Sequence, residues 1–322
     1  MGGAVTGYLI RRFLQALAVV WLVTVITFLL LKALPGGPVR AMLGTRAGNA
    51  ALVAALTKQL GLDKPVWQQY WNWLDALLHG NLGFSYYYNQ SVDSLLTQRL
   101  PKTVLLVGLS TVLALVIAVP YGIFQAVRRN KAADHVGTAF SFLFYGMPVY
   151  LTGIILINVF AVELHMFPSE GAQGAGISSF FTNFSAMILP IATLTLLTLA
   201  LFSRYMRSAT LDQLTQDYVR TARAKGAGEG RILYRHILRN ALIPIATLVG
   251  LSIPAIFSGA LVTETLFNYP GMGLLFYQSA QVEDYSTLLG VIIIVALATV
   301  VGSMLADVLY AVLDPRVRYT SA

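Results

Sequence analysis

The residues of this chain best suited to binding chemistry form a basic block between positions 217 and 244. The stretch reads DYVRTARAKGAGEGRILYRHILRNALIP, and its Lys and Arg side chains are Arg220, Arg223, Lys225, Arg231, Arg235 and Arg239. Such side chains donate hydrogen bonds to anionic groups, so the block suits water, anionic lipid or an acidic partner. The sequence on both sides is long and apolar with few charges. The block is therefore a polar interruption in a chain built mostly for an apolar environment.

Glycine divides the basic block into two short stretches with helical patterns. Gly226, Gly228 and Gly230 follow one another closely, and glycine at this density breaks helices and permits a sharp turn. After them an arginine recurs at every fourth position, which places the arginines on one helical face. On the opposite face we expect Leu233, Ile237 and Ala241, with Leu238 as the exception. A loop that fixes topology and touches lipid headgroups needs few charges, so the length of this segment favours a docking element.

The sequence shows no motif for nucleotide binding, metal binding or catalysis. Gly226 to Gly230 read GAGEG and lack the spacing of a phosphate-binding loop, and that motif occurs nowhere else in the chain. The sequence has no cysteine, which excludes disulfides, thiolate metal sites and cysteine nucleophiles. The four histidines fall in predicted loops or at span edges, where neither an intramembrane hydrolase nor a metal cluster would place them. We expect no catalytic residue, no metal site and no directly bound cofactor.

The composition indicates a membrane protein. Of 322 residues, 57% are hydrophobic and 11% are charged, whereas soluble domains carry about 25% charged residues. A helix that crosses a bilayer needs about 20 mostly apolar residues. Six stretches qualify: Phe13 to Leu31, Thr103 to about Val127, about Val136 to Val162, about Ser185 to Tyr205, about Ile243 to Val262 and about Thr287 to Leu309.

Two of these stretches need comment. The first follows an arginine pair like a signal peptide, but its apolar run is longer than the usual 7–15 residues and no A-x-A-like site follows, so we interpret it as a retained anchor. The third is interrupted by Gly146-Met147-Pro148, where we predict a kink.

Charge sets the expected orientation. With six spans, 15 of the 22 Lys and Arg residues fall on the side that holds both termini and the basic block. The two short loops on the other side, about 163–184 and 265–286, contain none. Basic residues gather on the cytoplasmic side, so both termini are predicted to be cytoplasmic and the protein to lie in the plasma or inner membrane. The formal charge of +8 then reflects this asymmetry, and no nucleic-acid partner is expected.

One sizeable exterior segment remains, from position 35 to 101. Its middle carries LGLDKP at 60–65, followed by Trp67, Tyr70, Trp71, Trp73 and Leu74 in amphipathic helical spacing. Anchoring at the membrane interface is one interpretation of this aromatic cluster, and ligand binding is the other.

The predicted organisation follows from these observations. The expected units are an N-terminus with the first span at 1–34, an exterior segment at 35–101, a core with the remaining spans at 102–309, and a cytoplasmic tail at 310–322. Within the core, 209–243 is the cytoplasmic loop that contains the basic block.

Several motifs resemble one family. YVRTARAKG at 218–226 with LRNALIP at 238–244 is similar to the EAA loop of ABC-importer permeases, in the form of the dipeptide/oligopeptide/nickel branch. ETLFNYPGMG at 264–273 resembles the E-T-x-F-x-x-P-G-x-G signature of the same branch. Further similar stretches are YLIRR at 8–12, LPGGP at 34–38, LGLDKP at 60–65 and LYAVLDPR at 309–316.

The chain also departs from the generic EAA pattern. Ala222, Gly226 and Pro244 are kept, whereas Arg220 stands where the glutamate would be and Thr221 replaces the first alanine. The distance from glycine to proline is longer than in the general motif. These departures favour the peptide branch, and the long exterior segment indicates the first of its two paired permeases.

The resemblance implies an all-α type I importer permease with six transmembrane helices. It implies that a second homologous permease, two ATP-binding subunits and an extracytoplasmic solute-binding protein act with this chain, and that the ATPases use ATP and Mg²⁺. The expected cargo is a di- or oligopeptide, and the surrounding medium is membrane lipid. The expected ATPase-coupling residues are Arg220, Thr221, Ala222, Arg223, Lys225, Gly226, Ala227, Gly228, Glu229, Arg231 and Arg235. A stand-alone secondary transporter or channel is the alternative, although the six spans show no paired halves.

Residues of the translocation pathway are harder to identify. Polar side chains within spans are costly in lipid and usually face protein or water, which makes Asn158 and Glu264 candidates. Met147 and Pro148 are further candidates as a hinge, and a packing kink is the alternative.

Overall fold

The computed structural model describes residues 2–33, 39, 43, 49–59, 61–85, 87–174, 176–258 and 260–313. Within them, five helices are long and apolar enough to cross a membrane. They are α1 (Gly2–Lys32), α5 (Val92–Val127), α9 (Phe184–Leu214), α12 (Leu238–Ser258) and α15 (Tyr285–Leu313). These helices confirm five of the predicted spans, and their long apolar runs explain why: a helix satisfies every interior backbone group within the segment.

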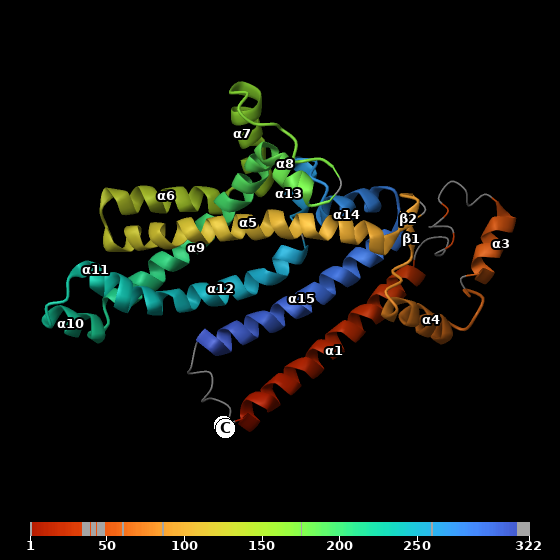
Figure 1. Ribbon diagram of the computed structural model, residues 1–322, viewed down its shortest axis with the longest axis horizontal. Helices are drawn as coiled ribbons and strands as arrows, with labels where there is room; N and C mark the ends of the chain where they lie inside the picture. The colour runs from red at the N-terminus through yellow and green to blue at the C-terminus, as the bar shows by residue number, and fades with distance from the viewer. Residues whose placement is uncertain are drawn as a thin grey trace.

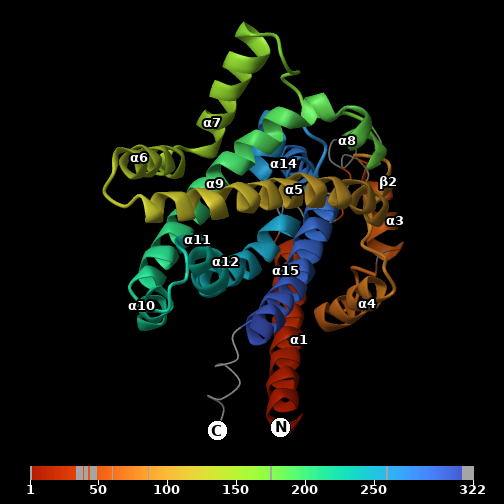
Figure 2. The ribbon, with the colours of Figure 1, turned by 60° about the vertical axis from the view of Figure 1, so that its left-hand side comes forward.

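The long helices pack side by side in an order that differs from the chain order. α5 lies against α9, α12 against α15 and α9, and α1 against α15 (Figure 1). α1 lies at the outside of this arrangement in both ribbon views (Figure 2). The bundle therefore exposes much of the apolar surface of α1.

The third predicted span is broken rather than kinked. α6 (Ala132–Gly146) is followed by α7 (Val149–Leu156), which continues as a π-helical segment (Ile157–Glu163), and the chain bends by 106° between them. Met147 between them has an extended backbone, with φ −79° and ψ 128°. The ring of Pro148 disfavours the helical conformation of the residue before it, and proline supplies no N–H to continue the ladder. As a result α6 runs along α5 and α7 stands away from it (Figure 1).

The segment 35–101, which was predicted to be exterior, contains short elements within its described residues. They are α3 (Ala50–Gln59), α4 (Val66–Leu78) and a hairpin of β1 (Phe84–Ser85) and β2 (Gln90–Ser91), paired antiparallel. α5 begins at Val92, so the predicted boundary near position 101 falls inside this helix, which contains Pro101. The predicted turn at 34–38 and the residues Leu60 and Tyr86 lie outside the described residues.

Smaller helices lie in separate parts of the bundle. α14 (Met272–Gln281) lies toward the hairpin, α8 (Ser178–Thr182) and α13 (Leu261–Leu266) lie beside α5, and α10 (Asp217–Ala224) and α11 (Glu229–Arg231) lie at the end of the bundle away from the hairpin (Figure 1). A π-helical segment, Ile232–Ile237, joins α11 to α12. The basic block and the ETLFNYPGMG stretch therefore occupy separate parts of the molecule.

Candidate functional site

The basic block is anchored to the bundle by buried apolar side chains. Val219 on α10 and Ile232 and Ile237 after the turn are each at most 1% exposed. They belong to one apolar cluster with Met206 of α9 and Ile123 of α5. Complete burial of such a side chain contributes about 1.5–3 kcal/mol. A movement of this segment would therefore be transmitted to α9, α5 and α12.

A glycine-dependent turn ends α10. The N–H of Gly226 donates to the carbonyl of Arg223 at 2.9 Å, and the N–H of Ala227 donates to the carbonyl of Ala222 at 3.1 Å. This pair of bonds is the Schellman arrangement, which requires a left-handed residue at its centre. Gly226 has φ +78°, so glycine is favoured there for its backbone freedom.

An ion pair joins α10 and α11 across this turn. The Nε and Nη2 atoms of Arg223 donate to the two carboxylate oxygens of Glu229 at 2.7 and 3.0 Å. Both side chains are solvent-exposed, so the contribution of this pair is to orientation rather than to stability. Because two parallel hydrogen bonds fix the relative direction of the partners, α10 and α11 present one surface.

That surface is basic. The exposed residues among the predicted coupling set are Arg220, Thr221, Arg223, Lys225, Gly226, Gly228, Glu229, Arg231 and Arg235. Ala222 and Ala227 are half-buried and pack against the apolar cluster. Arg239 is also exposed, which confirms that the three spaced arginines share an outward face.

The opposite face agrees with the prediction and includes one further residue. Leu233 is partly buried and packs against the apolar cluster, and Ile237 and Ala241 are buried in it, as predicted. Ile232 was not predicted to face inward and is fully buried. It begins the π-helical segment Ile232–Ile237, whose turns close i to i+5 and so differ from the α-helical spacing on which the prediction rested.

The pathway candidates do not lie in one cluster. Met147 and Pro148 form the break between α6 and α7, and Asn158 lies exposed in the π-helical segment that follows α7. Glu264 is fully buried on α13. A role in the pathway remains a prediction for each of these four residues.

Glu264 caps a helix from the outside. Its Oε2 accepts hydrogen bonds from the N–H groups of Gly273 at 2.7 Å and Leu274 at 3.1 Å, and its Oε1 accepts one from the Thr103 hydroxyl at 2.7 Å. The same hydroxyl accepts the N–H of Met272 at 2.8 Å. The first three N–H groups of α14 are thus satisfied by α13 and α5, where they would otherwise lack partners. Burial raises the pKa of Glu264, and the hydrogen bonds that it accepts oppose that shift.

The glycines of this stretch allow the carboxylate to approach. A Cβ at Gly271 would lie 2.4 Å from the Cδ of Glu264 and 2.5 Å from the Oγ1 of Thr103, and a Cβ at Gly273 would lie 2.5 Å from the Cα of Leu261. The glutamate and the two glycines of ETLFNYPGMG are therefore parts of one packing arrangement. Sequence reasoning did not identify Thr103, because its partner lies 161 positions away.

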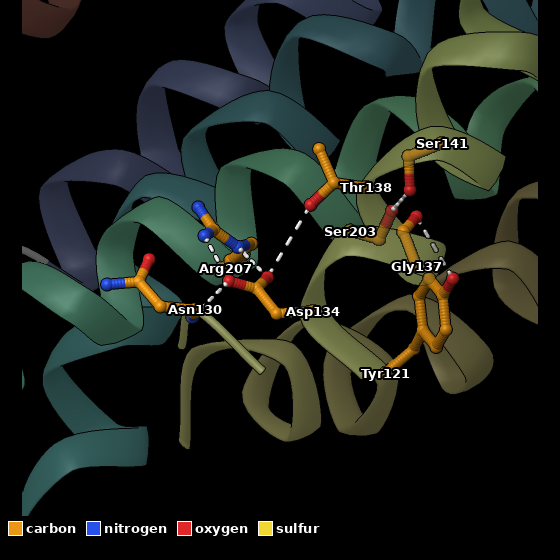
Figure 3. Close-up of polar contacts among 8 residues, drawn as sticks. All are labelled: Tyr121, Asn130, Asp134, Gly137, Thr138, Ser141, Ser203 and Arg207. Carbon is orange, nitrogen blue, oxygen red and sulfur yellow. Dashed lines mark hydrogen bonds and ion pairs between the residues drawn. The ribbon is translucent and has the colours of Figure 1, made fainter. Parts of the chain in front are cut away.

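A second buried charge lies where α6 begins. Asp134 accepts hydrogen bonds from Nε and Nη2 of Arg207 on α9, both at 2.7 Å, and one from the N–H of Asn130 at 3.0 Å (Figure 3). The side chain of Asp134 is 3% exposed and that of Arg207 is 27% exposed. Sequence reasoning did not identify Asp134 or its pairing with Arg207. The aspartate in the first turn after Arg128-Arg129-Asn130-Lys131 was the available signal.

Further polar contacts continue along the same helices. The hydroxyls of Ser141 and Ser203 are hydrogen-bonded at 3.1 Å, and Tyr121 Oη donates to the carbonyl of Gly137 at 3.2 Å (Figure 3). These contacts join α5, α6 and α9. The first arm of the broken span is thereby held along α5 and α9, whereas α7 turns away from α5 and packs on α9 and α13 (Figure 2).

Comparison with known proteins bears on both the basic block and the ETLFNYPGMG stretch. A family model described as the binding-protein-dependent transport system inner membrane component matches residues 118–319, and a model of the N-terminal part of such components matches residues 5–107. The oligopeptide transport system permease protein AppB of Bacillus subtilis is 39% identical over 314 residues, which cover 97% of this chain and 99% of that protein. The chain belongs to this family of transport permeases. The glutathione transport system permease protein GsiC of Escherichia coli is 34% identical over 312 residues, with the same coverage of 97% and 99%.

Family membership confirms the resemblance to peptide-class ABC importer permeases and the all-α membrane fold. The family consists of membrane subunits of binding-protein-dependent transport systems, so the permease is a non-catalytic component. Its relatives are aligned over almost their whole length, and the matched region includes both the basic segment and the ETLFNYPGMG stretch.

Proposed function

We propose that this permease forms half of the translocation pathway of an ATP-driven importer for di- or oligopeptides. A second, homologous permease supplies the other half. An extracytoplasmic solute-binding protein delivers the cargo, and two associated ATPase subunits bind ATP and Mg²⁺. Both termini and the basic segment face the cytoplasm.

The observation that carries the proposal is the two-sided construction of the segment from Asp217 to Ile237. One side is fixed to α5, α9 and α12 by Val219, Ile232 and Ile237, which are buried. The other side is an exposed basic surface held in shape by the turn at Gly226. A segment with an ordered exposed face and a buried face fixed to the bundle can convert the movement of a docked partner into a tilt of the spans. Such a partner biases a two-state bundle through its differential contacts with the two states.

The peptide class of the cargo is supported by the relatives. Two aligned proteins are named for oligopeptide and glutathione transport, and glutathione is itself a tripeptide. The orientation is supported by the distribution of Lys and Arg.

The turn at Gly226 provides the test. Gly226→Val places a β-branched residue at φ +78°, where non-glycine residues are strained. Gly226→Asn is the matched variant, because asparagine tolerates this conformation. A Cβ at Gly226 would meet nothing within 4 Å, so steric collision within the chain does not distinguish the two.

In the reconstituted complex we expect Gly226→Val to lower substrate-stimulated ATP hydrolysis at least tenfold, and Gly226→Asn to retain most of it. Gly230→Ala lies at an ordinary φ inside α11, also without a neighbour within 4 Å, and should behave as the unaltered protein. Equal stimulation in Gly226→Val and the unaltered protein would overturn the coupling role. A stand-alone secondary transporter or channel, the alternative, would purify from detergent without ATPase subunits.

A further inference from the structure

The helix α4 of the exterior segment has three distinct faces. The first packs on α1: the ring of Phe28 lies 5.3 Å from that of Tyr70 and 5.8 Å from that of Trp73, measured between centroids. The Thr24 and Tyr70 hydroxyls are hydrogen-bonded at 3.0 Å, and Lys32 Nζ donates to Gln69 Oε1. The contacts on α1 recur at every fourth residue, so α4 rests on one stripe of that helix.

A second face is apolar and uncovered. Trp67 is 67% exposed, Trp71 58% and Leu78 78%, and with the partly buried Leu74 they recur at i, i+4, i+7 and i+11. This spacing defines one helical stripe, and no other part of the described chain covers it. We name Trp67, Trp71, Leu74 and Leu78 the tryptophan stripe. The third face is polar and exposed, and it carries Asn72 and Asp75.

The position of α4 along α1 indicates which medium surrounds the tryptophan stripe. The apolar window of α1 runs from Arg11 to Leu30. Thr24 lies six residues before the end of that window, which corresponds to about 9 Å along a helix that rises 1.5 Å per residue. Since Tyr70 bonds to Thr24, α4 reaches below the end of the hydrophobic zone. Interfacial helices bury their apolar face to about 5–10 Å at the boundary of headgroups and acyl chains.

α1 also exposes apolar side chains at the level where α4 packs. Leu22, Ile26 and Leu29 are 51%, 48% and 55% exposed, on a face of α1 other than the one that contacts α4. Tryptophan prefers this zone because its ring is apolar and its N–H can reach water or headgroups. Lys32, which follows the end of the window, would lie near the headgroups.

We propose that the tryptophan stripe is a lipid-binding surface: α4 lies in the outer leaflet of the bilayer and anchors the exterior segment to it. The occupant is the acyl-chain and headgroup boundary of the membrane lipid. A helix held in this plane by α1 on one side and lipid on another fixes the height of the exterior segment above the membrane. The inference depends on the membrane-spanning character of α1 and, for the choice of leaflet, on the proposed orientation; it is independent of the cargo and of the ATPase partner.

The absence of cysteine in this chain makes the test specific. A nitroxide label at Trp71→Cys or Leu78→Cys reports on the stripe in the complete complex, reconstituted in vesicles of phosphatidylcholine and phosphatidylglycerol. Leu22→Cys, on the exposed face of α1, is the reference within lipid, and Asp75→Cys, on the polar face of α4, is the reference in water. The complex with the unaltered chain gives the background from partner cysteines.

Collision with oxygen reports exposure to lipid, and collision with a water-soluble nickel chelate reports exposure to water. We expect labels at positions 71 and 78 to collide preferentially with oxygen, at a depth shallower than position 22, whereas position 75 collides with the chelate. A preference for the chelate at positions 71 and 78 would place the stripe in water and overturn the proposal. Protection from both agents would overturn it as well, because a protein partner would then cover the stripe.

Discussion

The buried pair of Asp134 and Arg207 predicts an asymmetric response to substitution. Arg207→Met would leave the carboxylate of Asp134, which is 3% exposed, with the N–H of Asn130 as its remaining short hydrogen bond. An uncompensated buried charge costs about 3–5 kcal/mol. Asp134→Asn instead leaves Arg207, which is 27% exposed and can turn toward water. The asparagine oxygen can still accept a hydrogen bond, so we expect a loss of about 1–2 kcal/mol.

A neighbouring arginine supplies the control. Arg204 lies on the same helix and stacks on Phe142 and Tyr145, with its guanidinium carbon 4.5 and 4.6 Å from the ring centroids. Arg204→Met removes the same groups from a half-buried cation–π contact, and such contacts contribute about 0.5–2 kcal/mol. The comparison therefore separates the loss of an arginine from the loss of the partner of a buried carboxylate.

The assay is unfolding of the purified complex in detergent micelles titrated with sodium dodecyl sulfate, followed for each single variant and for Asp134→Asn/Arg207→Met. The double variant should lose less stability than the sum of the two single variants, because removing both charges leaves none unpaired. The reasoning is refuted if Arg207→Met costs no more than Arg204→Met. It is also refuted if Asp134→Asn is the more damaging of the two single substitutions.

Two further predictions concern the capped helix α14. Gly271→Ala should cost about 1–3 kcal/mol of stability in the same assay, because its Cβ would lie 2.4 Å from Glu264. Gly108→Ala is the control, because a Cβ at Gly108 would meet nothing within 4 Å. Equal losses of stability in the two variants would contradict the packing argument. Burial raises the pKa of Glu264 from 4.5, so this group contributes most to stability below its unfolded pKa and loses that contribution as the pH rises through its folded pKa. The unaltered protein and Glu264→Gln should therefore be unfolded at each pH, and the stability of the unaltered protein relative to the variant should fall as the pH rises from about 4.5. If the difference in stability between the two proteins stays constant up to pH 8, Glu264 keeps its ordinary pKa.

Much of the architecture was predictable because lipid imposes strict requirements on sequence. Five long apolar runs appear as helices where they were predicted, since a spanning helix must be both long and apolar. The outward face of the arginines at 231, 235 and 239 also followed from local periodicity. Leu233, Ile237 and Ala241 face the apolar cluster as predicted. The burial of Ile232 was not predicted, because the choice between an α-turn and a π-turn is decided by packing against α9 and α5 rather than by local pattern.

The sequence by itself indicated the membrane environment, most of the spans, the family and the basic segment. Each of these depends on composition or on residues close together in the chain. Tertiary structure alone decided the contacts between distant positions. It joined Thr103 to Glu264 and Asp134 to Arg207, and it turned the predicted kink at Pro148 into a bend of 106°. It also placed α4 on the C-terminal turns of α1. These features depend on which helices pack side by side, and a buried polar group takes its partner from whichever neighbour that packing supplies.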